Sequence, residues 1–120
     1  MPPVRRMFAM LLVVGTPLTT VHADPQRGKT LYESRCIGCH SIDANRVGPA
    51  HRGVVGRKVG SVADFEYSPA LKGSALVWSA ALLQRWLTNP EALIPGQRMG
   101  YSVSDAVDRA DLVEYLQTQK

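Results

Sequence analysis

The sequence predicts a small all-α domain with long loops, and three observations lead to this fold class. Apolar residues recur at helical spacing in separate segments, and residues suited to capping a helix precede them. No segment shows a convincing strand pattern of alternating apolar and polar residues. Residues 41–61 are rich in Gly, Asn and Pro, which is typical of loop. We therefore expect about four or five helices.

The first residues are typical of an export signal rather than of a folded element. Arg5 and Arg6 form a positive region, residues 7–14 are apolar, and Val21-His22-Ala23 offers a cleavage site. The apolar run is too short to span a bilayer, which needs about 20 residues. A retained membrane-surface anchor is the alternative, and the letters RRMF also raise twin-arginine export. We expect residues 1–23 to be a cleaved secretory signal peptide.

Residues 24–120 then form a single domain of 97 residues. A domain of this size buries only about 60–70% of its unfolded surface, so a large apolar cofactor at its centre would add useful core. Without Arg5 and Arg6 the chain carries 12 basic and 10 acidic residues, a net charge of +2. The cations are scattered singly, which argues against nucleic-acid binding. We expect no stable membrane insertion after cleavage.

The first helix is expected to run from Pro25 into the cysteine pair. Asp24 is a suitable N-cap, and Pro25 suits the first helical position. Gly28, Leu31 and Tyr32 fall on one face at helical spacing, and Arg35 and Cys36 continue it.

Three further helices are expected. Ser68 opens a short one that Gly73 closes, and Ser79 caps a longer one that Asn89-Pro90 stops. Residues 104–120 are acidic at their start and end on a lysine, which suits the helix macrodipole.

The letters CIGCH contain both cysteines of the chain, Cys36 and Cys39, followed directly by His40. A redox disulfide of the thioredoxin type would need a βαβ pattern, which is missing here. A zinc site would need four ligands, and His51 would have to complete a set in which adjacent Cys39 and His40 have poor chelate geometry. C-x-x-C-H is the attachment signature of c-type haem. The pattern favours one haem bound through Cys36 and Cys39, with His40 beneath the iron.

Met99 is the candidate for the second axial ligand of the iron. The other three methionines, Met1, Met7 and Met10, leave with the signal. Met99 lies in a segment rich in Pro and Gly, where a methionine has no helical face to pack, and a thioether is a known axial ligand. His51 is the competitor, but its neighbours indicate loop surface or a local hydrogen bond.

Several motifs in order resemble the class I cytochromes c, in particular the mitochondrial-type and bacterial soluble group. They are GKTLYESRCIGCH, VGP, GRKVGS, FEYSPAL, VW, LLQRWLTNP, IPGQRM and RADLVEYL, and the resemblance covers residues 28–116. It implies the small cytochrome c fold, in which helices and loops wrap round one covalently bound haem.

The resemblance also implies roles for individual residues. Pro49 corresponds to the proline whose carbonyl accepts the ring N–H of His40 and orients it. Three residues correspond to those that hydrogen-bond the haem propionates: Arg57, Tyr67 and Trp78. Asn89 corresponds to the residue that braces the methionine loop. Gly28 and Tyr32 correspond to the positions where the first helix crosses the last, a structural role.

The chain departs from the mitochondrial proteins at several positions. Trp86 replaces a tyrosine near the methionine sulfur, and Glu91 and Ala92 replace lysines. The loop after His40 is also shorter. Of the cationic ring round the haem edge, the residues that remain are Arg35, Arg46, Lys72 and Arg98.

These features predict a one-electron carrier between redox proteins, monomeric and located in a bacterial periplasm. It would not be an enzyme, because His40 and Met99 leave the iron no open position and no acid, base or nucleophile constellation is evident. One alternative is a gas sensor or peroxidase-like haem domain in which Met99 is a labile ligand. Another is a dedicated electron-transfer subunit of one dehydrogenase.

Overall fold

The computed structural model describes residues 1–4 and 10–120, and within these ranges it is helical without a strand. The five helices are α1 (Pro25–Arg35), α2 (Pro69–Lys72), α3 (Ala80–Thr88), α4 (Pro90–Leu93) and α5 (Ala106–Thr118). One isolated antiparallel bridge joins Lys58 and Val77. The expected all-α class with long loops is confirmed.

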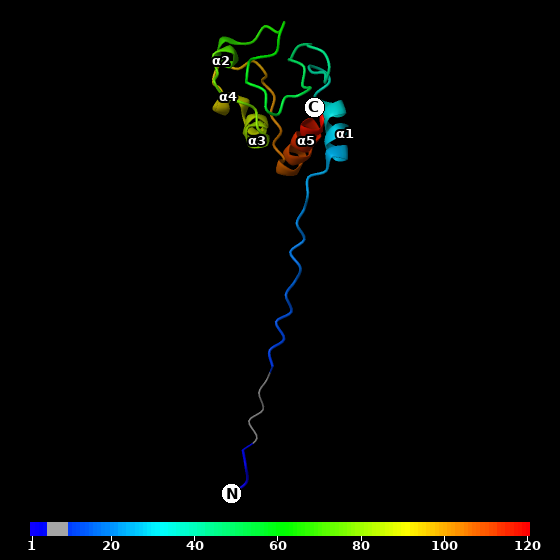
Figure 1. Cartoon of the computed structure of the whole chain (residues 1–120), viewed down its shortest axis with the longest axis vertical. Helices are drawn as coiled ribbons and strands as arrows, with labels where there is room; N and C mark the ends of the chain where they lie inside the picture. Colours follow the sequence, from blue (N-terminus) through cyan, green and yellow to red (C-terminus); the bar gives the residue numbers. More distant parts are fainter. Residues whose placement is uncertain (5–9) are drawn as a thin grey trace.

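Residues 10–23 run away from the helices as an extended trace (Figure 1). Arg5, Arg6 and Met7, which belong to the expected signal peptide, lie outside the described residues. In the part of the chain that the structure describes, no helix is long and apolar enough to cross a bilayer. Cleavage after Ala23 stays a prediction.

The helices begin where the capping residues place them. The Asp24 carboxylate accepts hydrogen bonds from the amides of Gln26 and Arg27, and Ser79 Oγ accepts one from the amide of Leu82 at 3.0 Å. Asn89 was expected to stop α3 and to brace the methionine loop, and its side chain also accepts a hydrogen bond from the Ala92 amide and starts α4. The short helix α4 is therefore the fifth helix, which the sequence analysis did not place.

Helices α1 and α5 lie side by side, and α3 packs against α5 (Figure 1). Gly28 permits the close approach of α1, because a Cβ there would overlap the carbonyl group of Asp111. Tyr32 on the same face is 3% exposed. The predicted helix crossing at Gly28 and Tyr32 is confirmed. It holds α1 in place, and the cysteine motif follows directly after this helix.

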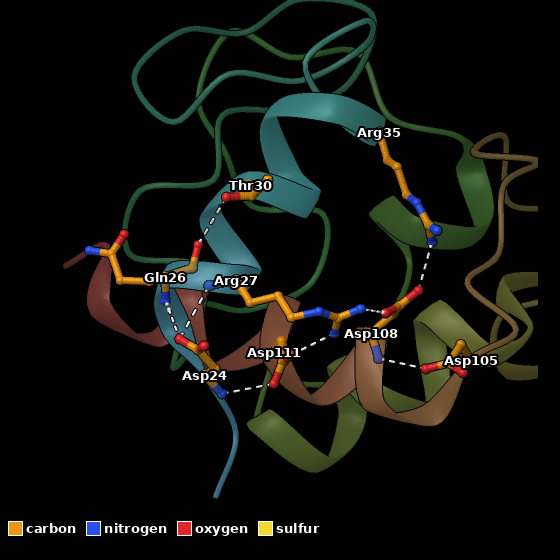
Figure 2. Close-up of polar contacts among 8 residues, drawn as sticks. All are labelled: Asp24, Gln26, Arg27, Thr30, Arg35, Asp105, Asp108 and Asp111. Carbon is orange, nitrogen blue, oxygen red and sulfur yellow. Dashed lines mark hydrogen bonds and ion pairs between the residues drawn. The ribbon is translucent and has the colours of Figure 1, made fainter.

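An ionic clamp formed by Arg27, Arg35, Asp108 and Asp111 ties α1 to α5 (Figure 2). Arg27 donates to Asp111 at 2.7 Å and to Asp108 at 2.5 Å, and Arg35 lies 3.2 Å from the other oxygen of Asp108. The backbone amide of Asp24 donates to Asp111 at 2.7 Å. Both carboxylates are buried, and a buried charge needs such partners.

We expect Asp111→Asn to lower the free energy of unfolding by about 1–3 kcal/mol at neutral pH, because charge-assisted hydrogen bonds are lost in a buried place. Burial opposes ionisation of Asp111, but the hydrogen bonds from Asp24 and Arg27 prevail and hold its pKa below the ordinary value. The stabilisation is therefore complete above the unfolded pKa of about 4 and is lost as the pH falls through the folded pKa. Denaturant unfolding of the two proteins at neutral and acidic pH measures both effects.

Glu114→Gln, on the same helix, is the matched control and should cost little. Equal losses in the two variants, or a loss at Asp111 that does not depend on pH, would contradict the clamp.

Candidate functional site

A central cavity of about 420 Å³ lies between the helices and the long loops. Its wall is mainly apolar, with Leu83, Trp86, Leu112 and Leu116 from α3 and α5. Eight of the residues predicted for the site line this cavity: Cys36, Cys39, His40, Pro49, Arg57, Tyr67, Trp78 and Met99. The fold thus collects side chains that are far apart in the sequence round one space of ligand size.

The cysteine motif forms a tight turn at the end of α1. Helix α1 ends at Arg35, after which the amides of Cys39 and His40 both donate to the Cys36 carbonyl, at 3.1 and 2.8 Å. Both cysteines are free thiols. Burial raises the pKa of Cys36 to about 11, so this thiol stays protonated in the folded chain. The turn presents Cys36, Cys39 and His40 to the same cavity.

The His40 ring is held by the two residues that follow the loop 41–47. Its Nδ1 lies 3.1 Å from the Pro49 carbonyl oxygen, so Nδ1–H donates and the Nε2 lone pair remains available. A Cβ on Gly48 would overlap the His40 ring, so only glycine leaves room for it. Burial lowers the pKa of His40, which favours the neutral form that binds metals. Gly48 had no separate role in the sequence analysis.

His51 is a loop residue whose side chain is partly buried rather than on the surface, and of the two expectations for it the hydrogen bond is the one the structure shows. Its ring stacks on the His40 ring with centroids 4.1 Å apart and planes 22° apart. Its Nδ1 lies 2.9 Å from the Tyr32 hydroxyl. The in-plane lone pairs of stacked rings cannot point at one ion from opposite sides, so His51 cannot be the ligand opposite His40.

Met99 lines the cavity from a loop that two side chains brace. The Gln97 Oε1 accepts hydrogen bonds from the amides of Met99 and Gly100, at 2.6 and 3.3 Å. Glu91 in turn accepts from the Gly96 amide and from the Gln97 side chain, both at 3.0 Å. Sequence reasoning missed this brace, for which an acceptor side chain two residues before Met99 was the one local signal.

The predicted polar residues on another part of the wall include Arg57, one of whose nitrogens lacks a partner among the described residues. Arg57 donates from one terminal nitrogen to the Arg52 carbonyl at 3.2 Å, while its Nε is buried without a partner among the described residues. Burial lowers the pKa of Arg57. The Tyr67 hydroxyl accepts from the Val62 amide at 3.1 Å, and the Trp78 ring packs edge-on against Trp86.

Asn89 is not among the residues that line the cavity. Its side chain accepts a hydrogen bond from the Ala92 amide and caps α4. Its influence on the methionine loop would run through this helix, which places Glu91 and thereby the brace.

A cysteine–histidine turn and a loop methionine that share one apolar cavity define a small all-α haem protein of the c type. The family model for cytochrome c matches residues 25–120, and the chain belongs to this family.

Similar proteins include "Cytochrome c 2.1" of Caenorhabditis briggsae, 40% identical over 80% of this chain and 88% of that protein. "Cytochrome c2" of Rhodopila globiformis is 40% identical over 81% of this chain and 94% of that one. The solved structure of cytochrome cH from Methylobacterium extorquens is 39% identical, with a TM-score of 0.75 over 80% of this chain and 99% of that one. Membership of the family implies a covalently bound haem c and electron transfer to redox partners.

The residues that line the cavity fit a haem. The apolar wall suits the macrocycle, and the buried Nε of Arg57, unpartnered among the described residues, suits an anion such as a propionate. The space at Gly48 seats His40 with its metal-binding nitrogen free. Cys36 and Cys39 supply the two thiols of the attachment signature.

We expect Gln97→Ala to loosen the backbone at Met99 and Gly100, because both amides lose their acceptor. Loss of a hydrogen bond of about 1 kcal/mol corresponds to roughly fivefold faster amide exchange at these two residues. Hydrogen–deuterium exchange resolved by residue measures it. Gln84→Ala in α3 is the matched control, and unchanged exchange in the Gln97 variant would show that the brace does not hold the loop.

Proposed function

We propose that the protein is a one-electron carrier whose haem is held through Cys36 and Cys39 and ligated by His40 and Met99. The observation that carries this proposal is the single cavity that contains all four of these side chains. When bound, the haem supplies an iron that takes up and releases one electron. The chain supplies the attachment, the ligands and a dry environment.

Each wall residue has a defined task in this proposal. Pro49 holds the His40 ring and raises its basicity through the hydrogen bond to Nδ1. Arg57, Tyr67 and Trp78 would provide hydrogen-bond donors for the propionates. The Nε–H of Arg57 has no other partner among the described residues. Asn89 acts on the methionine loop through α4. The thioether of Met99 favours the reduced iron and so raises the potential.

The protein would work as a carrier and not as an enzyme because His40 and Met99 would both hold the iron. The brace of Gln97 and Glu91 supports this role, because it holds the backbone amides of Met99 and Gly100. No open position then remains for a substrate or a gas molecule.

Docking to partners is only mildly electrostatic in this proposal. The net charge of the domain is small, and Arg35, expected among the steering cations, is paired with Asp108. Arg98 lines the cavity, and Arg46 donates to the Ile37 carbonyl in the cysteine motif at 3.2 Å. Salt screens the effect of such cations over about 8–10 Å. We propose a monomer that meets a donor and an acceptor in turn.

The bacterial periplasm is the proposed compartment. The relatives come from bacteria and from eukaryotes, so this assignment depends on the leader pattern of residues 1–23. Attachment of a haem needs reduced thiols that are reachable, whereas Cys36 is partly buried in the fold. This favours general secretion of an unfolded chain before attachment.

Met99→Ala tests the proposed ligand set. The oxidised wild type should show a weak near-infrared charge-transfer band from sulfur to iron, and the variant should lose it. The potential should fall because the thioether no longer favours the reduced iron, and the reduced variant should gain rapid carbon monoxide binding. Optical spectroscopy, a redox titration and stopped-flow mixing measure the three effects.

Ser102→Ala is the control, because it changes an exposed residue of the same segment. A wild type that lacks the band and binds carbon monoxide as fast as the Met99 variant would overturn the proposal and favour the sensor or enzyme alternative.

A further inference from the structure

The His40 ring has a second support besides the Pro49 carbonyl. The hydrogen bond from Nδ1 holds one edge of the ring, while His51 covers one of its faces at a centroid distance of 4.1 Å. An edge contact alone permits the ring to rock about that bond. A face contact resists this motion, because rocking would drive one ring into the other.

Two contacts of Tyr32 hold the His51 ring in place. The Tyr32 hydroxyl lies 2.9 Å from Nδ1 of His51, and the two rings meet edge to face at 5.6 Å. Tyr32 is itself 3% exposed and packs against Tyr115 of α5, with centroids 5.4 Å apart. A series of side-chain contacts therefore leads from the packed pair of α1 and α5 through Tyr32 and His51 to the face of the His40 ring.

The polar atoms of this pair face each other. Burial raises the pKa of Tyr32, so its hydroxyl keeps its proton and is able to donate to Nδ1 of His51. A buried hydroxyl and a buried imidazole that satisfy each other avoid the cost of unpaired polar groups.

We infer that Tyr32 and His51 are positioning residues for His40: His51 fixes the plane of the ligand ring, and Tyr32 fixes His51. This inference rests on the proposed function, in which His40 binds the iron. A ligand ring kept in one plane does not have to reorient when the iron changes its charge. The pair thus gives an electron carrier a rigid ligand on this side.

Paramagnetic proton NMR of the oxidised, haem-loaded protein reads the ligand plane directly, because the spread of the haem methyl shifts depends on its orientation. We expect the methyl pattern of the wild type to change in His51→Leu, which replaces the ring with an apolar side chain of similar bulk. Tyr32→Phe keeps the packing of its ring and removes only the hydroxyl, and it should shift the pattern in the same direction.

A double-mutant cycle separates positioning from simple packing. Because Tyr32 acts through His51, the variant with both changes should match His51→Leu. Tyr115→Phe removes a hydroxyl from the same aromatic cluster and is the matched control, with an unchanged pattern. His51→Gln retains a side-chain acceptor for Tyr32 and serves as the second variant if His51→Leu does not fold.

The outcomes distinguish this inference from the proposed function. Wild-type methyl patterns in both the His51 and Tyr32 variants, or independent additive shifts, would overturn the positioning role while leaving His40 as ligand. A wild-type spectrum without a histidine-ligated low-spin iron would overturn both.

Discussion

The structure depends on a central space that the side chains of the chain do not fill. Helices α3 and α5 place Leu83, Trp86, Leu112 and Leu116 round a cavity of about 420 Å³. A small domain buries little apolar surface on folding. A cofactor in this cavity would add the buried apolar surface that the side chains alone do not supply. The long loops follow from the same constraint, because they must pass round the cofactor and deliver side chains to it.

The walls of this space are each held by a separate device. The ionic clamp between α1 and α5 fixes the helix that ends in the cysteine turn. Gly48, Pro49 and the stacked ring of His51 hold His40, while Gln97 and Glu91 hold the loop of Met99. In the proposed function His40 and Met99 would be rigid ligands, which suits a carrier because the protein then changes little when the electron arrives or leaves.

Local chemistry made much of this predictable. The helix starts are predictable from Asp24, Ser68 and Ser79, because a capping side chain acts on amides two or three residues away. The cofactor is predictable from the letters CIGCH, because this signature also lies within five consecutive residues. The pairing of Tyr32 with His51 and of Arg27 with Asp111 could not be predicted, because those contacts span 19 and 84 residues and depend on how α1 is set against its neighbours.

The mass of the denatured mature protein tests most directly whether a covalently held haem fills this space. The protein must come from cells that attach haem to exported chains, and denaturation removes anything that is not covalently bound. The account predicts the mass of the chain from Asp24 plus one haem. A bare chain of 97 residues with a disulfide between Cys36 and Cys39 would contradict it.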